Sequence, residues 1–128
     1  MNYSQTQLVP QGKFKDYDAD LSLGKRGELE TLGILSGTLE VKTDRLAYRS
    51  GNLFVEYECR GKASGLAATT ADWWAFNILD DTGAIKCVLL VKTDRLKAEC
   101  RAIYSAKKTN GGDDNAAKGV LLPIRRLL

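Results

Sequence analysis

A stripe of leucines at helical spacing is the first strong signal in the hydrophobic pattern. It predicts a helix over 21–35, with Asp20 or Ser22 as its N-cap. Glu28 falls in the middle of the leucine stripe, whereas Glu30 points to the opposite, solvated side. A carboxylate on an apolar helix face is costly unless it is paired or bound to a metal ion. Glu28 is therefore a candidate ligand.

Two strands with many charges are predicted after this helix, at 38–45 and 52–60, with turn residues at 50–52. Side chains two residues apart on a strand share a face. The charges that gather in this way are Glu40, Lys42 and Asp44 on the first strand and Glu56 and Glu58 on the second. A hairpin of the two strands would bring these charges together. The alternative is that they form the solvated face of the strands.

The second half of the chain carries a strong hairpin signal. Hydrophobic runs at 75–79 and 84–91 flank the sequence DDTG, which is typical of a turn between antiparallel strands. A second helix is predicted at about 94–105, with Thr93 as its cap.

Small and polar residues mark the remaining segments. Residues 61–70 are predicted to form a loop, and Thr69 has the pattern of a helix start because an acid follows three residues later. Residues 106–119 have the composition of a flexible loop. A last strand is predicted at 119–124, where Pro123 favours the edge of a sheet.

The pentapeptide VKTDR occurs twice, at 41–45 and at 91–95. The flanking patterns of the two copies differ, so we expect no structural repeat. The first copy is predicted to lie within a strand, and the second at a junction between a strand and a helix.

Composition limits the possible chemistry. The 128 residues are expected to form a single domain, with a polar N-terminal arm over 1–15. The chain has no histidine, so carboxylates, lysines or hydroxyls must supply any chemistry. Cys59, Cys87 and Cys100 are odd in number and widely spaced, which predicts reduced thiols. The net charge of +3 is compatible with nucleic-acid binding.

The hydrophobic pattern contains no apolar run long enough to span a bilayer. The N-terminus is polar and lacks the apolar region of a secretory signal. A cytoplasmic protein without a membrane partner is therefore expected.

Convergent carboxylates in a chain without histidine favour a hard divalent cation. Mg²⁺ typically takes one or two carboxylates from a protein. Such an ion, Mg²⁺ or Mn²⁺, lowers the pKa of a bound water and stabilises charge on a phosphate oxygen. Lys42, between Glu40 and Asp44 on one face, is placed to orient that water or to offset the phosphate charge.

The order of these motifs resembles that of a known family. The motifs are DLSLGKRGE, EVKTDR, GNLFVEYECRGKASG and TTADWW, and together they cover roughly residues 16–92. They are similar to the PD-(D/E)XK nuclease superfamily, in particular to small phage-encoded endonucleases and Holliday-junction resolvase-like members. The resemblance implies an α/β fold, a single-domain restriction-endonuclease-like core with a mixed β-sheet flanked by helices. It also implies Mg²⁺-dependent cleavage of DNA phosphodiester bonds, with the helix glutamate and the strand acids around the metal, in the host cytoplasm if the protein is phage-encoded.

One position departs from the family pattern. The strand FVEYEC carries Glu58 where the family has a lysine, while EVK at 40–42 lies one strand early. In one interpretation, Asp44 and Glu56 bind the metal and Lys42 replaces the missing lysine. In the other, Glu40 and Lys42 form the acid–lysine pair and Asp44 is auxiliary. The first is favoured because residues 61–74 resemble the segment that comes after the active strand in that family. The candidate ligands are Asp44, Glu56, Glu40 and Glu58, with Glu28 serving in either case.

Several residues after the second charged strand are candidates for DNA contacts. They are Arg60, Lys62, Ser64, Thr69 and Thr70, although basic and hydroxyl side chains are also ordinary on surfaces and loops. Trp73 and Trp74 could stack on bases, but packing in the core or at a dimer interface is favoured. Cutting both strands of duplex or branched DNA would require a homodimer. The alternative function is a catalytically inactive nuclease-fold module that binds DNA or a protein partner.

Overall fold

The computed structural model describes residues 14–128. The chain divides into two compact units, and the boundary in the sequence lies between Gly37 and Thr38. The first unit contains the helix α1 (Phe14–Ser36). This helix begins earlier than predicted, so the proposed N-caps Asp20 and Ser22 lie inside it. No proline or glycine occurs between Phe14 and Leu23 to stop the helix from extending backward. The predicted N-terminal arm lies outside the described residues, apart from the first two residues of α1.

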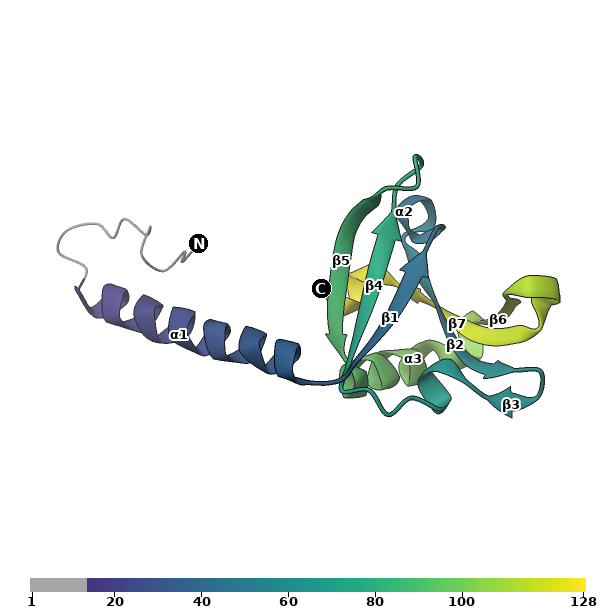
Figure 1. The fold of residues 1–128 in the computed structure, drawn as a ribbon, viewed down its shortest axis with the longest axis horizontal. Helices are drawn as coiled ribbons and strands as arrows, with labels where there is room; N and C mark the ends of the chain where they lie inside the picture. Colours follow the sequence, from purple (N-terminus) through teal and green to yellow (C-terminus); the bar gives the residue numbers. More distant parts are fainter. Residues whose placement is uncertain (1–13) are drawn as a thin grey trace. The chain divides into compact units, whose positions relative to one another are not determined.

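The second unit contains two sheets (Figure 1). The three-stranded sheet has the order β1 (Leu39–Asp44), β4 (Trp73–Leu79) and β5 (Ile85–Lys92). The four-stranded sheet has the order β3 (Lys62–Ala63), β2 (Asn52–Cys59), β7 (Ala117–Pro123) and β6 (Lys108–Gly111). The helical segments are α2 (Ala47–Ser50), α3 (Thr93–Lys107), η2 (Gly65–Ala67), η3 (Asp113–Asn115) and η4 (Ile124–Leu127). The α/β class with a mixed sheet and helices is thus confirmed, although the strands divide between two sheets.

The two charged strands form as predicted, but they do not pair with each other. β1 pairs in parallel with β4, from Leu39 opposite Trp73 to Asp44 opposite Ile78, while β2 pairs with β7. The predicted hairpin is therefore wrong. The physical reason lies in the connection, because the carboxylate of Asp44 accepts the N–H groups that begin α2. A helical turn replaces the tight turn and redirects the chain into the other sheet.

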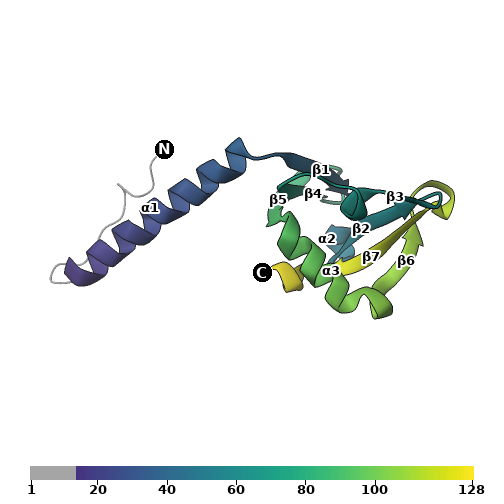
Figure 2. The same ribbon diagram turned by 90° about the horizontal axis from the view of Figure 1, so that it is seen from below.

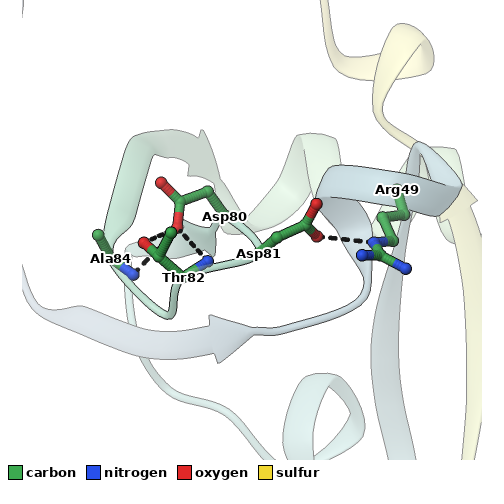
Figure 3. Close-up of polar contacts among 5 residues, drawn as sticks. All are labelled: Arg49, Asp80, Asp81, Thr82 and Ala84. Atoms are coloured by element: carbon green, nitrogen blue, oxygen red, sulfur yellow. Dashed lines mark hydrogen bonds and ion pairs between the residues drawn. The ribbon is translucent and has the colours of Figure 1, made fainter.

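The hairpin of β4 and β5 is confirmed, and its turn is drawn in Figure 3. Asp80 Oδ1 accepts hydrogen bonds from the Thr82 backbone N–H at 2.8 Å and from the Thr82 hydroxyl at 2.6 Å. A third bond comes from the Ala84 N–H at 3.2 Å. Asp81 forms an ion pair with Arg49 at 2.6 Å, which ties the turn to α2.

The start of α3 differs from its prediction in one detail. Thr93 is the first residue of the helix, and Lys92 occupies the N-cap position. The buried Thr93 hydroxyl donates to the carbonyl oxygen of Ala71 at 2.6 Å. It therefore ties the start of α3 to the loop before β4 and does not cap the helix.

The helix start predicted at Thr69 is also wrong. Asp72, its expected partner, accepts the backbone N–H and the hydroxyl of Thr38, both at 3.0 Å. These bonds join the residues that directly precede β1 and β4, and the chain continues into β4 at Trp73. Asp72 therefore stabilises the pairing of β1 with β4 and does not begin a helix.

The segment 106–119, predicted as a flexible loop, contains β6, η3 and the start of β7. Its glycines serve close packing. A Cβ at Gly111 would lie 2.8 Å from the Phe54 ring, and a Cβ at Gly119 would lie 2.5 Å from it. The Phe54 ring thus lies over two glycine positions of neighbouring strands, which orders the segment.

The last strand is not an edge strand, because β7 lies between β2 and β6. Pro123 is nevertheless at a local edge. It pairs with Asn52 of β2, while β6 pairs with β7 no further than Val120. The missing N–H of Pro123 therefore costs no bond with β6.

The core of the second unit lies between the two sheets and α3, which packs on β7 (Figure 2). Its largest fully buried side chains are Trp74, Phe76, Leu53, Leu96, Leu122 and Val55. Trp74 is thus a core residue, as favoured by the sequence. None of the helices among residues 14–128 combines the length and apolar character needed to cross a bilayer.

Candidate functional site

Asp44 is the last residue of β1, and its carboxylate joins three elements. Oδ1 accepts the N–H groups of Leu46 at 2.9 Å and Ala47 at 2.7 Å, at the start of α2. Oδ2 accepts the N–H of Phe54 at 3.2 Å. Three N–H donors fix the position of the carboxylate. Asp44 is therefore anchored to β2 although β1 and β2 belong to different sheets.

Glu56 lies on the same strand, two residues after Phe54. Its Oε2 accepts the hydroxyl of Ser64 at 2.7 Å. The loop that carries Ser64 comes very close to β2 at Gly65, which has a φ of 49°. A Cβ at this position would collide with the carbonyl oxygen of Glu56. Gly65 therefore permits the contact that orients the Glu56 carboxylate.

Asp44 lies at the edge of β2 that faces away from β7. The Phe54 N–H points away from β7 toward Asp44, and N–H groups two residues apart on a strand point to the same edge. Two residues span about 7 Å along a strand. Within residues 14–128 no strand pairs with this edge before Glu58. Asp44 thus reaches the edge of the strand that carries Glu56, and the loop at Ser64 and Gly65 covers that edge beside Glu56.

Lys42 lies on the same face of β1 as Asp44, as predicted. Its Nζ is 3.0 Å from Glu40 Oε1 and 5.7 Å from the centroid of the Trp74 ring. Lys42 and Glu40 therefore form an ion pair with each other, and the aromatic face of Trp74 holds the ammonium group in place.

Glu58 does not share a face with Glu56, contrary to the prediction. A β-bulge separates the two residues, so that Glu56 lies opposite Gly119 and Glu58 lies opposite Lys118. Adjacent residues of β7 point to opposite faces, and so do their partners. Glu58 instead forms an ion pair with Lys118 at 3.1 Å. The position that carries the lysine in the resembling family is therefore turned away from Glu56.

The candidate DNA contacts lie in three different places. Arg60 and Lys62 are exposed at the hairpin of β2 and β3, where Arg60 has a φ of 51°. Ser64 is bound to Glu56. Thr69 and Thr70 line a polar cavity of about 330 Å³. The charged residues of the same cavity are Lys92, Lys97, Asp72 and Asp94.

Glu28 lies on α1 in the first unit, and its side chain is exposed. Its part in a metal site stays a prediction.

Among residues 14–128, no group of three or more acidic, cysteine or histidine side chains is arranged to hold a metal ion. Asp44, at the edge of β2, and Glu56, on β2 itself, provide two carboxylates. Oxygen ligands of this type suit Mg²⁺ or Mn²⁺, and Mg²⁺ takes its remaining ligands from water and phosphate. Glu40 and Glu58 each have a lysine partner instead.

Comparisons with protein-family models, with curated proteins and with solved structures gave no match. The resemblance to the PD-(D/E)XK superfamily therefore rests on the quoted motifs alone.

Sequence reasoning missed two features of this site. The bulge after Glu56 leaves no mark in the hydrophobic alternation, because Val55 and Tyr57 are apolar and Glu56 and Glu58 are charged, as in a regular strand. Gly65 was visible only as a loop glycine. Its value lies in the space that it leaves for a backbone carbonyl, which depends on the tertiary structure.

Proposed function

We propose that this protein is a divalent-metal-dependent phosphodiester hydrolase that acts on DNA, with Asp44 and Glu56 as its metal-binding carboxylates. The hydrogen bond from the Phe54 amide to Asp44, at 3.2 Å, is the observation that carries the proposal. It attaches the first acid to the strand that carries the second, two residues further along β2.

Each neighbouring residue has a part in this proposal. Ser64 holds one oxygen of Glu56 and leaves the other as a ligand. Lys42, held by Glu40 and Trp74, lies on the same face of β1 as Asp44 and offsets phosphate charge. A bound Mg²⁺ or Mn²⁺ would supply an acidified water and charge stabilisation at the phosphate. Thr69 and Thr70 are donors for the DNA backbone.

The proposal includes a symmetric dimer. A chain of 128 residues covers only a short piece of duplex, and two-fold symmetry would present one site to each strand. Branched DNA, including four-way junctions, is the preferred substrate in this proposal.

The test compares two isosteric changes on one strand, Glu56→Gln and Glu58→Gln. Because Glu56 is at the proposed site and Glu58 is on the other face, cleavage of supercoiled and four-way-junction DNA with Mn²⁺ should fall at least a hundredfold only in Glu56→Gln, on the order of the loss of a catalytic group. Full activity of Glu56→Gln, or an equal loss in both variants, would overturn the site.

Metal binding gives an independent measurement. Mn²⁺ should raise the melting temperature of the protein, because an ion that binds only the folded state stabilises it. The rise should disappear in Glu56→Gln and persist in Glu58→Gln.

A second candidate is a non-catalytic DNA-binding module. The observation in its favour is that Asp44 already accepts three backbone N–H groups, which is a complete structural role. DNA binding in EDTA, without cleavage and without stabilisation by Mn²⁺, would favour this candidate.

A further inference from the structure

A separate cavity of about 310 Å³ lies between α3 and the sheet that contains β2 and β7. Its floor is apolar. Val55 is 1% exposed, Val120 is 2% exposed and Leu66 is 7% exposed. Val55 and Glu56 are adjacent on β2 and point to opposite faces, so this cavity is distinct from the proposed metal site. Its volume is at the lower end of the range for small-molecule sites, about 300–1,000 Å³.

The rim of the cavity is positively charged. Lys97 and Arg101 lie one turn apart on α3, and both line the cavity. No acidic side chain lines it, and neither cation forms an ion pair within residues 38–128. Two cations beside a low-dielectric wall attract an anion more strongly than they would in open solvent.

A pair of tyrosines adds a hydrogen-bond donor to the rim. The hydroxyl oxygens of Tyr57 and Tyr104 are 3.4 Å apart, and their ring centroids are 5.5 Å apart in an edge-to-face arrangement. In such a pair one O–H donates to the other oxygen, and the second O–H is free to donate elsewhere. The hydrogen bond with Tyr104, followed by burial, raises the pKa of Tyr57 to about 12. The Tyr57 hydroxyl therefore keeps its proton at neutral pH.

We propose that this cavity binds a small amphiphilic anion, such as an aromatic sulfonate or a medium-chain carboxylate. The apolar body would lie on Val55, Leu66 and Val120, and the anionic group would face Lys97 and Arg101. The tyrosine pair would donate one hydrogen bond to it. Charge complementarity selects this ligand class, because a neutral apolar ligand would leave both cations without a partner. The proposal does not depend on the nuclease activity.

The probe is 1-anilinonaphthalene-8-sulfonate, measured by fluorescence titration against its neutral relative N-phenyl-1-naphthylamine. We expect one sulfonate site per chain. The double variant Lys97→Gln/Arg101→Gln should bind the sulfonate at least about tenfold more weakly, since two charge-assisted contacts are lost. Binding of the neutral probe should change less than about twofold. The control Lys86→Gln/Lys107→Gln removes two exposed lysines outside the cavity and should bind like the wild type.

A second variant tests the location without changing charge. Ala67→Phe places a large side chain at the mouth of the cavity and should abolish sulfonate binding. Cooperative thermal unfolding of every variant shows that the dye does not report a molten state. Decanoate should displace the sulfonate probe. Displacement by single-stranded DNA but not by decanoate would overturn the proposal in favour of a nucleic-acid surface, as would unchanged sulfonate affinity in either the double variant or Ala67→Phe.

Discussion

Asp44 accepts hydrogen bonds from three backbone amides and is also a proposed metal ligand, so its substitutions separate structure from chemistry. Asp44→Ala removes every acceptor and should destabilise the fold by about 1–2 kcal/mol, the cost of a lost cap. Asp44→Asn keeps the Oδ1 acceptor for α2 and should cost about half as much. Urea denaturation measures both values. Cleavage should be lost in both variants, because an amide is a poor Mg²⁺ ligand. Retention of cleavage by the asparagine variant would reduce Asp44 to a structural role.

Gly65 and Gly61 form a matched pair of loop glycines. Both have a positive φ, 49° and 79°, but only Gly65 has an atom within reach of a new Cβ, the carbonyl of Glu56. Gly61→Ala should therefore show only the cost of its backbone conformation, about 1 kcal/mol. Gly65→Ala should cost about 1–3 kcal/mol more, since overpacking must move the loop. Equal losses in thermal melts of the two variants would show that the loop is not pressed against β2.

At the scale of single residues, the sequence predicted which residues lie on the strands better than it predicted where their side chains point. Asp44 and Lys42 lie on the first charged strand and Glu56 lies on the second, as predicted, and Ser64 contacts a candidate site residue, although as a partner of Glu56. Glu58 was misplaced because alternation along a strand holds only while the register is regular. A bulge depends on the partner strand, which a local pattern cannot contain.

At the scale of elements, the turn of the β4–β5 hairpin gives a pH prediction. The Thr82 hydroxyl, the Thr82 N–H and further contacts lower the pKa of the Asp80 carboxyl. A pKa below the unfolded value, about 3.9, means that the stabilisation is present above that value and is lost as pH falls through the folded one. The melting temperature should therefore fall as the solution is acidified below about pH 4.

Two variants assign this acid dependence to the turn. Asp80→Asn should melt lower at neutral pH and show a smaller fall on acidification. Asp81→Asn lacks the ion pair to Arg49 but keeps the Asp80 turn, and should retain the full fall. Asp72, whose pKa is lowered first by the backbone N–H of Thr38, should leave a residual fall in Asp80→Asn. An unchanged pH profile in Asp80→Asn would contradict the assignment.

Elements that are encoded locally were predicted well. The β4–β5 hairpin, α3 and the two charged strands all form within a few residues of their expected bounds. The two VKTDR copies lie in β1 and at the β5–α3 junction, as predicted. Strand partners were not predictable, because pairing of β1 with β4 and of β2 with β7 is decided by residues far apart in sequence. The prediction of a flexible loop at 106–119 was wrong for the same reason. The close packing of its glycines depends on the Phe54 ring, which is far away in sequence.

At the scale of the whole molecule, α1 allows a test of the predicted role of Glu28. Glu28 and Glu30 are both exposed on one helix, so either substitution should leave stability within about 0.5 kcal/mol of the wild type. If Glu28 supplies a metal ligand, Glu28→Gln should lower the rate of DNA cleavage at least tenfold and weaken the Mn²⁺ dependence, on the order of a lost ligand contact. Glu30→Gln should cleave like the wild type. Equal rates of DNA cleavage in the two variants would show that Glu28 supplies no metal ligand and that the proposed site belongs to the second unit alone.

The α/β class was predictable at this scale, but the division of the strands between two sheets was not. Hydrophobic alternation reports that a strand has a buried face, and it does not report which layer covers that face. The proposed site lies where the two sheets approach each other, with Asp44 from one and Glu56 from the other. Its assembly therefore depends on tertiary contacts that no single motif encodes.

The pairing of β2 with β7 also fixes when the site can form during protein synthesis. Glu56 leaves the ribosome well before the residues of β7, and β1 must likewise wait for β4. Strand pairs so distant in sequence form late, because a long segment of chain must be closed first. A nascent chain that ends before β7 lacks the strand that β2 pairs with, so the strand that carries Glu56 is not yet held in its sheet. Under the proposed function, nuclease activity would therefore wait until β7 has been synthesised.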